Sequence, residues 1–188
     1  MSPGPAASRP EAGAQRGEAE RSRSGRPPLR PFGLVLHHDG SWSHEGQPIR
    51  NRRLREHFDR SVRYLPDERK FVVTLRHFRG QVEVEEAAFF VRAVEPARGL
   101  VRLSDGTEEP LDASTLHPSP IDGAWLCRVK RDLAADGLLA RFTHAAHAEL
   151  AACIEAEGAH PRLRLAGRLL RVPDALLEGL VPADAAGA

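Results

Sequence analysis

Two side chains with ligand-binding chemistry, Trp42 and His44, lie two positions apart near the start of the chain. Alternate residues of a β-strand point to the same face, so a strand here would place an indole beside an imidazole. Such a pair could stack on a ring-containing ligand and hydrogen-bond to it. The same spacing is also typical of a core tryptophan beside a structural histidine, and we favour this packing interpretation.

Three carboxylates, Glu83, Glu85 and Glu86, are the residues best placed for general acid–base work. Glu83 and Glu85 alternate with valines, which is typical of the solvated face of a half-buried strand. Glu86 falls outside that alternation. A small hydrolase that pairs His44 with Glu45 or Glu86 is therefore one hypothesis for this chain.

The sequence gives weaker evidence for a metal site or a covalent nucleophile. His144 and His147 share a helical spacing, but no carboxylate or thiolate accompanies them as a further ligand. Cys127 and Cys153 each lie in an apolar pattern, where a thiol behaves as a small hydrophobe. The sequence contains no glycine-rich phosphate loop and no nucleophile elbow. We therefore expect no metal and no cofactor, and the balance is against an enzyme.

A cluster of arginines occupies residues 50–63, where six arginines face only Glu56 and Asp59. This predicts a basic helix that could contact nucleic acid, an anionic ligand or a protein partner. Six arginines and three glutamates give residues 1–31 a charge of +3. Because the whole chain carries +1, the remainder carries −2, which argues against general polyanion binding.

Three Asp-Gly pairs indicate hairpins, because glycine adopts the positive φ that a tight two-residue turn requires. Apolar alternation and β-branched runs around them predict a mainly antiparallel α+β protein. The turns are Asp39-Gly40, Asp105-Gly106 and Asp136-Gly137, and strands are expected at residues 34–38, 41–44, 71–75, 81–86, 89–95, 100–104, 107–111, 125–130, 138–142, 163–165 and 169–172.

Two helices should complete the fold. Asn51 is a suitable N-cap for a helix that carries Leu54, Phe58 and Val62 on one face and ends near residues 65–67. Thr143 can cap a second helix that ends at residue 158. Each helix follows an Asp-Gly hairpin, so the order predicts an internal duplication of a hairpin-helix-strand unit.

The predicted division of the chain has four parts. Residues 1–31 contain almost no large apolar side chains and should form a disordered tail, and residues 174–188 should form a flexible one. Lobes are expected at residues 32–97 and 98–173. No apolar run approaches the ~20 residues of a membrane span, and no secretory leader is evident, so we expect a cytoplasmic protein.

With these residues in view, the chain resembles the bacterial family called domain of unknown function 1285. The matching segments are residues 39–49, 82–89, 117–118 and 136–140. The resemblance implies an α+β fold with a duplicated motif and a C-terminal half superficially like a pleckstrin-homology domain. It also implies that a nucleotide-like ligand binds between the halves and that the protein has a role in signalling. It implies no enzymatic activity.

The chain departs from that family at several positions. Leu75-Arg-His-Phe78 replaces a Pro-Val-Glu-Lys segment, Ala88 replaces a proline, and His147-Ala148 replaces an aromatic pair. It is therefore identified as a divergent member.

Our leading hypothesis is a non-catalytic module that binds a small anionic or nucleotide-like ligand between two lobes. The alternative is a nucleic-acid-binding accessory protein that uses the helix at 50–63, although nucleic acid is not the partner we favour. The expected ligand-binding residues are Trp42, His44, Glu45, Arg50, Glu86, His117 and Arg141.

Overall fold

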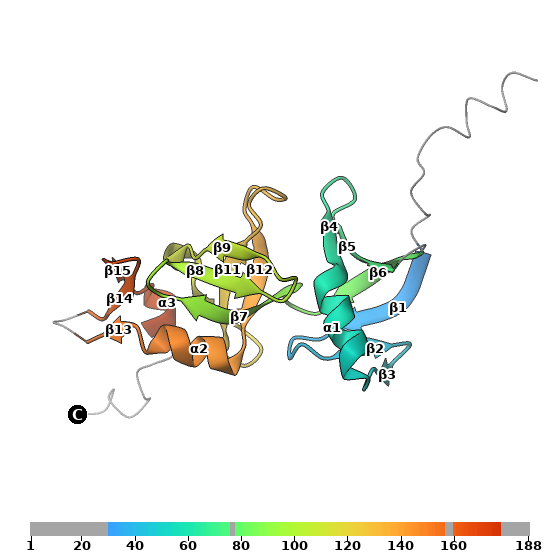
Figure 1. Cartoon of the computed structure of the whole chain (residues 1–188), viewed down its shortest axis with the longest axis horizontal. Helices are drawn as coiled ribbons and strands as arrows, with labels where there is room; N and C mark the ends of the chain where they lie inside the picture. The colour runs from blue at the N-terminus through green and yellow to red at the C-terminus, as the bar shows by residue number, and fades with distance from the viewer. Residues whose placement is uncertain (1–29, 76–77, 157–159, 178–188) are drawn as a thin grey trace, which may run out of the picture.

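The computed structural model describes residues 30–75, 78–156 and 160–177, which form two lobes joined end to end (Figure 1). The predicted α+β class with mainly antiparallel sheets is confirmed. None of the helices in these residues has the length and apolar character needed to cross a bilayer.

The N-terminal lobe is a six-stranded sheet in the order β3-β2-β1-β6-β5-β4, with the helix α1 (Arg52–Ser61) packed against it. The strand β1 pairs antiparallel with β2 and parallel with β6. The strands are β1 (Arg30–Leu36), β2 (Trp42–His44), β3 (Gln47–Pro48), β4 (Val62–Leu65), β5 (Lys70–Leu75) and β6 (Phe78–Val84).

Local chemistry explains the start of this lobe. Gly40 has φ +82° in the β1–β2 turn, and the Asp39 carboxylate accepts the Ser41 backbone N–H at 2.8 Å. The Asn51 side chain caps α1 by accepting the Leu54 backbone N–H, as predicted.

The end of α1 differs from the prediction. The helix stops at Ser61, and Val62–Leu65 forms β4, whose backbone pairs with β5. The β-branched Val62 is buried there as a strand residue, and Phe58 is buried on the helix. Leu54, expected on the same buried stripe, is 39% exposed.

The C-terminal lobe contains a second six-stranded sheet, in the order β10-β11-β12-β7-β8-β9, followed by a small three-stranded sheet, β13-β14-β15. The helix α2 (His144–Ala151) packs against β7 and β12. The elements are β7 (Phe89–Glu95), β8 (Leu100–Leu103), β9 (Glu108–Pro110), a 3-10 helix (Ala113–Thr115), β10 (His117–Pro118), β11 (Trp125–Val129), β12 (Leu138–Phe142), β13 (Ile154–Glu155), β14 (Arg162–Leu165), β15 (Arg168–Arg171) and α3 (Asp174–Leu177).

The two large sheets have the same strand order. Numbered from one to six within each sheet, the strands follow the order 3-2-1-6-5-4, and the first and last strands form a parallel central pair. The predicted duplication matched the Asp39-Gly40 hairpin to the Asp136-Gly137 hairpin. By sheet order these are strands 1–2 of one sheet and strands 5–6 of the other. The duplication stays a prediction, and the topology suggests a different alignment, β1–β6 with β7–β12.

The segment 85–88 connects the two sheets. The chain passes from the first sheet to the second within this segment, because residues 89–91 already pair with β12. The lobe boundary was predicted later, after residue 97. At the C-terminal end, α3 lies inside the tail that was expected to be flexible, and its Leu176 is buried. The N-terminal tail lies outside the described residues, except that β1 already begins at Arg30.

Buried apolar side chains form one core that continues through both lobes. Phe71 of β5 and Phe89 of β7 meet edge to face, with ring centroids 6.4 Å apart. Ala87 and Ala88 of the connecting segment are also buried. The lobes are therefore packed against each other and not merely linked.

Candidate functional site

Trp42 belongs to the core. Its side chain is 1% exposed, and its ring lies 5.2 Å from that of Phe58 on α1. The indole Nε1 donates to Asp59 Oδ1 at 2.9 Å, so its polar end is satisfied within the protein. Trp42 holds β2 against α1 and presents no face on which a ligand could stack.

Four other predicted residues are spread over the surface of both lobes. The His44 ring packs 4.7 Å from Phe32, and Glu45 is exposed at φ +49° in the β2–β3 turn. Arg50 is exposed in the loop before α1. His117 Nδ1 donates to the Thr115 carbonyl oxygen at 2.9 Å in the other lobe. These residues do not converge, and none of them lines the cleft described below.

Glu86 and Arg141 are brought together as a buried ion pair. Arg141 Nη1 donates to Glu86 Oε2 at 2.6 Å, and both side chains are almost fully buried. Ser119 also donates to Glu86, and Arg141 reaches the exposed Asp122. Burial alone would lower the pKa of Arg141, but its bonds to Asp122 and Glu86 raise it. The pair anchors the connecting segment to β12.

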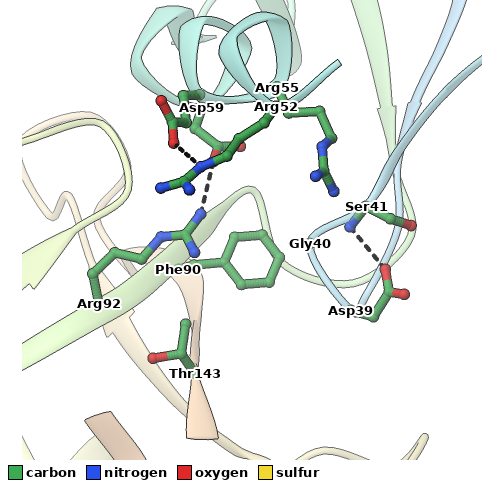
Figure 2. Close-up of a pocket in the computed structure, with 10 residues that line it drawn as sticks. Asp39, Gly40, Ser41, Arg52, Arg55, Asp59, Phe90, Arg92 and Thr143 are labelled. Carbon is green, nitrogen blue, oxygen red and sulfur yellow. Dashed lines mark hydrogen bonds and ion pairs between the residues drawn. The ribbon is translucent and has the colours of Figure 1, made fainter. Parts of the chain in front are cut away.

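A cleft of about 420 Å³ opens where the lobes meet (Figure 2). The β1–β2 turn and α1 contribute one wall, and β7 and the start of α2 contribute the other. Figure 2 shows arginine side chains of α1 extending toward Phe90 and the turn. The lining residues are Asp39, Gly40, Ser41, Arg52, Arg55, Glu56, Asp59, Phe90, Arg92 and Thr143.

Two of the three arginines in this cleft have carboxylate partners. Arg52 Nε donates to Glu56 Oε1 at 2.7 Å, one turn further along the helix. Arg92 Nη2 donates to Asp59 Oδ2 at 2.7 Å and lies over Phe90, 5.8 Å from the ring centroid. The pair of Arg92 with Asp59 connects β7 to α1 across the cleft.

Arg55 differs from its neighbours. Its Nε is buried and has no hydrogen-bond partner among the described residues, and no ion pair within 4.0 Å includes it there. Its guanidinium group therefore lines the cleft without a carboxylate partner in the described part of the chain. Arg55 is therefore the residue that most directly indicates a ligand.

Asp59 holds the cleft together. Burial raises the pKa of its carboxyl group, although the bonds from Trp42 and Arg92 act in the opposite direction. Both oxygens are committed to the protein, one to Trp42 in the core of the first lobe and the other to Arg92 on the cleft wall of the second. Asp59 is a structural acid and not a free base for catalysis.

The cleft suits anion binding better than catalysis. Guanidinium groups donate in a planar fork that matches carboxylate and phosphate. Thr143 Oγ1 is already engaged, since it donates to the Val91 carbonyl and accepts the Ala146 N–H. Histidine and cysteine do not line this cavity, and no group of metal-ligating side chains occurs within the described parts of the chain.

The fold has relatives of known structure. No family model and no curated protein matches the chain. A DUF1285 family protein from Silicibacter pomeroyi DSS-3 superposes with a TM-score of 0.56 and 18% identity, over 86% of this chain and 95% of that one. The resemblance to DUF1285 is confirmed at the level of the fold. A DUF1285 protein from Shewanella baltica OS155 matches with 14% identity and a TM-score of 0.41, over 60% and 85% of the two chains.

Within this DUF1285-like fold, the sequence identified only part of the cleft. The arginine-rich helix was noted, but its cleft-facing residues were not distinguished from Arg53 on the outside. The spacing of Arg52, Arg55 and Glu56 at three and four residues was the available signal. No local sequence pattern marked Arg92 as a site residue, because its partner on α1, Asp59, is 33 residues away.

Proposed function

We propose that this protein is a non-catalytic module that binds a small anionic ligand, such as a nucleotide, in the cleft between its lobes. The observation that carries the proposal is the position of Arg55, whose guanidinium group lines the cleft with no ion-pair partner among the described residues. A cytoplasmic location and a role in signalling belong to the same proposal.

The energetics favour an anion at Arg55. The Arg55 guanidinium lines the cavity without a carboxylate within 4.0 Å among the described residues, so an anion there would supply the missing counter-charge. Charge-assisted bonds to such oxygens are stronger than neutral ones. Arg52 and Arg92 line the same cavity, where each is already paired with a carboxylate. A volume of about 420 Å³ falls in the range of small-molecule sites.

The position of the cleft also supports a binding role. Arg52 and Arg55 belong to the first lobe, and Arg92 and Thr143 to the second. A ligand held by both walls would favour one relative orientation of the lobes over others. This coupling is what a signalling module requires.

Calorimetric titration with phosphate, pyrophosphate and AMP at constant ionic strength tests the proposal. The wild-type protein should bind at least one of them, and Arg55→Gln should weaken that binding. Arg53→Gln is the matched control, because Arg53 lies on the same helix but outside the cavity. A thermal-shift assay provides a second readout, since a ligand at 100 times its Kd stabilises by about 2.7 kcal/mol.

The proposal fails if the folded wild-type protein binds none of these anions, or if Arg55→Gln binds as tightly as wild type. An oligonucleotide that binds through Arg53, with affinity falling steeply as salt rises, would instead support the nucleic-acid alternative.

A further inference from the structure

The cleft continues along α1 into a second cavity of about 370 Å³. Both cavities share Glu56, Asp59 and Arg92, so they are the two ends of one groove. The second end lies between α1 and β8. Its remaining lining residues are Arg60, Arg102, Leu103, Ser104 and Gly106.

Arginines without an ion-pair partner in the described part of the chain lie at both ends of this groove. Arg60 and Arg102 have no carboxylate within 4.0 Å among the described residues, as Arg55 has none at the first end. The acids of the shared middle, Glu56 and Asp59, are already paired with arginines. Five arginines and three carboxylates line the two cavities, which leaves the groove positive.

The helix sets a lower limit on the spacing of the two ends, because Arg55 and Arg60 differ in height along it and leave it in directions about 140° apart. Arg55 and Arg60 are five residues apart on α1, which corresponds to about 7.5 Å along the helix axis at a rise of ~1.5 Å per residue. Between them, the ion pair of Asp59 with Arg92 occupies the middle of the groove without surplus charge. Each end therefore holds arginine without an ion-pair partner in the described ranges, and an ion pair lies between the ends.

We propose that the ligand of this site is an elongated small molecule with two anionic groups at its ends, separated by roughly 7 Å or more. One group binds at Arg55, and the other binds between Arg60 and Arg102. The inference rests on the proposed function and specifies its ligand class. A lone phosphate or carboxylate can occupy only one of the two ends.

A matched pair of synthetic probes tests the inference. Hexane-1,6-diyl bisphosphate carries a phosphate at each end of a neutral spacer, and hexyl phosphate carries the same spacer with one phosphate. In calorimetric titrations at fixed ionic strength, the bisphosphate should bind the wild-type protein at least about tenfold more tightly, because its second group gains a charge-assisted contact.

Three variants locate the two groups. The double variant Arg60→Gln with Arg102→Gln should abolish the advantage of the bisphosphate and leave hexyl phosphate binding within about twofold of wild type. Arg55→Gln should weaken both probes. Arg53→Gln should change neither, and circular dichroism confirms that each variant is folded.

The outcomes separate the two proposals. Equal affinity for the two probes, or a bisphosphate advantage that survives the double variant, overturns the two-ended ligand while the single-anion site stands. Absence of binding by either probe to the wild-type protein overturns both.

Discussion

Asp59 accepts a hydrogen bond from Arg92 Nη2 at 2.7 Å, and this contact joins α1 of the first lobe to β7 of the second. The carboxylate is the more buried partner, with 11% of its side chain exposed against 44% for the arginine. Its other oxygen accepts from Trp42 Nε1. One side chain thus connects the core of the first lobe to the wall of the second.

The first prediction concerns this carboxylate. Asp59→Ala should lower the free energy of unfolding by about 1–3 kcal/mol, because the buried Trp42 Nε1–H loses its acceptor. Asp59→Asn keeps an acceptor oxygen and removes a charge that burial disfavours, so it should cost less. Urea denaturation followed by tryptophan fluorescence measures both. Equal losses for the two variants would show that the charge, and not the acceptor, stabilises the fold.

The second prediction concerns the buried pair of Glu86 and Arg141. Glu86→Ala and Arg141→Ala should each cost about 3–5 kcal/mol, because each leaves a buried charge without this partner. The double variant should cost less than the sum of the two. Arg131→Ala is the control: its pair with Asp112 is exposed, so its loss should stay below about 1 kcal/mol. Strictly additive losses at Glu86 and Arg141 would contradict the prediction.

The third prediction concerns pH. The His38 backbone N–H donates to Glu85, and this bond is the largest cause that lowers the Glu85 pKa. The side-chain bond with Glu85 raises the His38 pKa, and His37 Nδ1 also lies 3.4 Å from the same carboxylate. The contribution of Glu85 to the stability of the fold is present above its ordinary pKa of 4.5. This contribution is lost as the pH falls through the lowered pKa of Glu85. The His38 contribution is present below 6.5 and is lost as the pH rises through its raised value.

The pair therefore stabilises the fold most between about pH 4.5 and 6.5. An NMR titration should show a lower His38 pKa in Glu85→Gln than in the wild type. Glu83→Gln, a charge change two residues away on an exposed position, should leave it nearly unchanged. A His38 pKa that does not respond to Glu85→Gln would rule out the pairing in solution.

Local signals in the sequence predicted the elements better than their arrangement. The Asp39-Gly40 turn and the caps at Asn51 and Thr143 depend on nearby atoms, and all three are present. The pairing of β1 with β6 and of β7 with β12 depends on contacts between distant residues, for which alternation gives no register. The pairing of Phe89 with Ala140 is a contact of the same kind, between residues 51 positions apart.

The same distinction applies to the candidate site. Glu86 and Arg141 were both identified from the sequence, but only the structure shows that they bind each other. Trp42 was identified by its type, and burial gives it a packing role. The importance of Arg55 and Arg92 depends on where the second lobe meets α1, which no local pattern encodes.

The shared strand order limits how far the lobes can move. The segment 85–88 leaves one sheet from a central strand and enters the other at a central strand. Fully extended, it would let Val84 and Phe89 separate by no more than about 17 Å. This short tether and the core that continues through both lobes keep the lobes from parting.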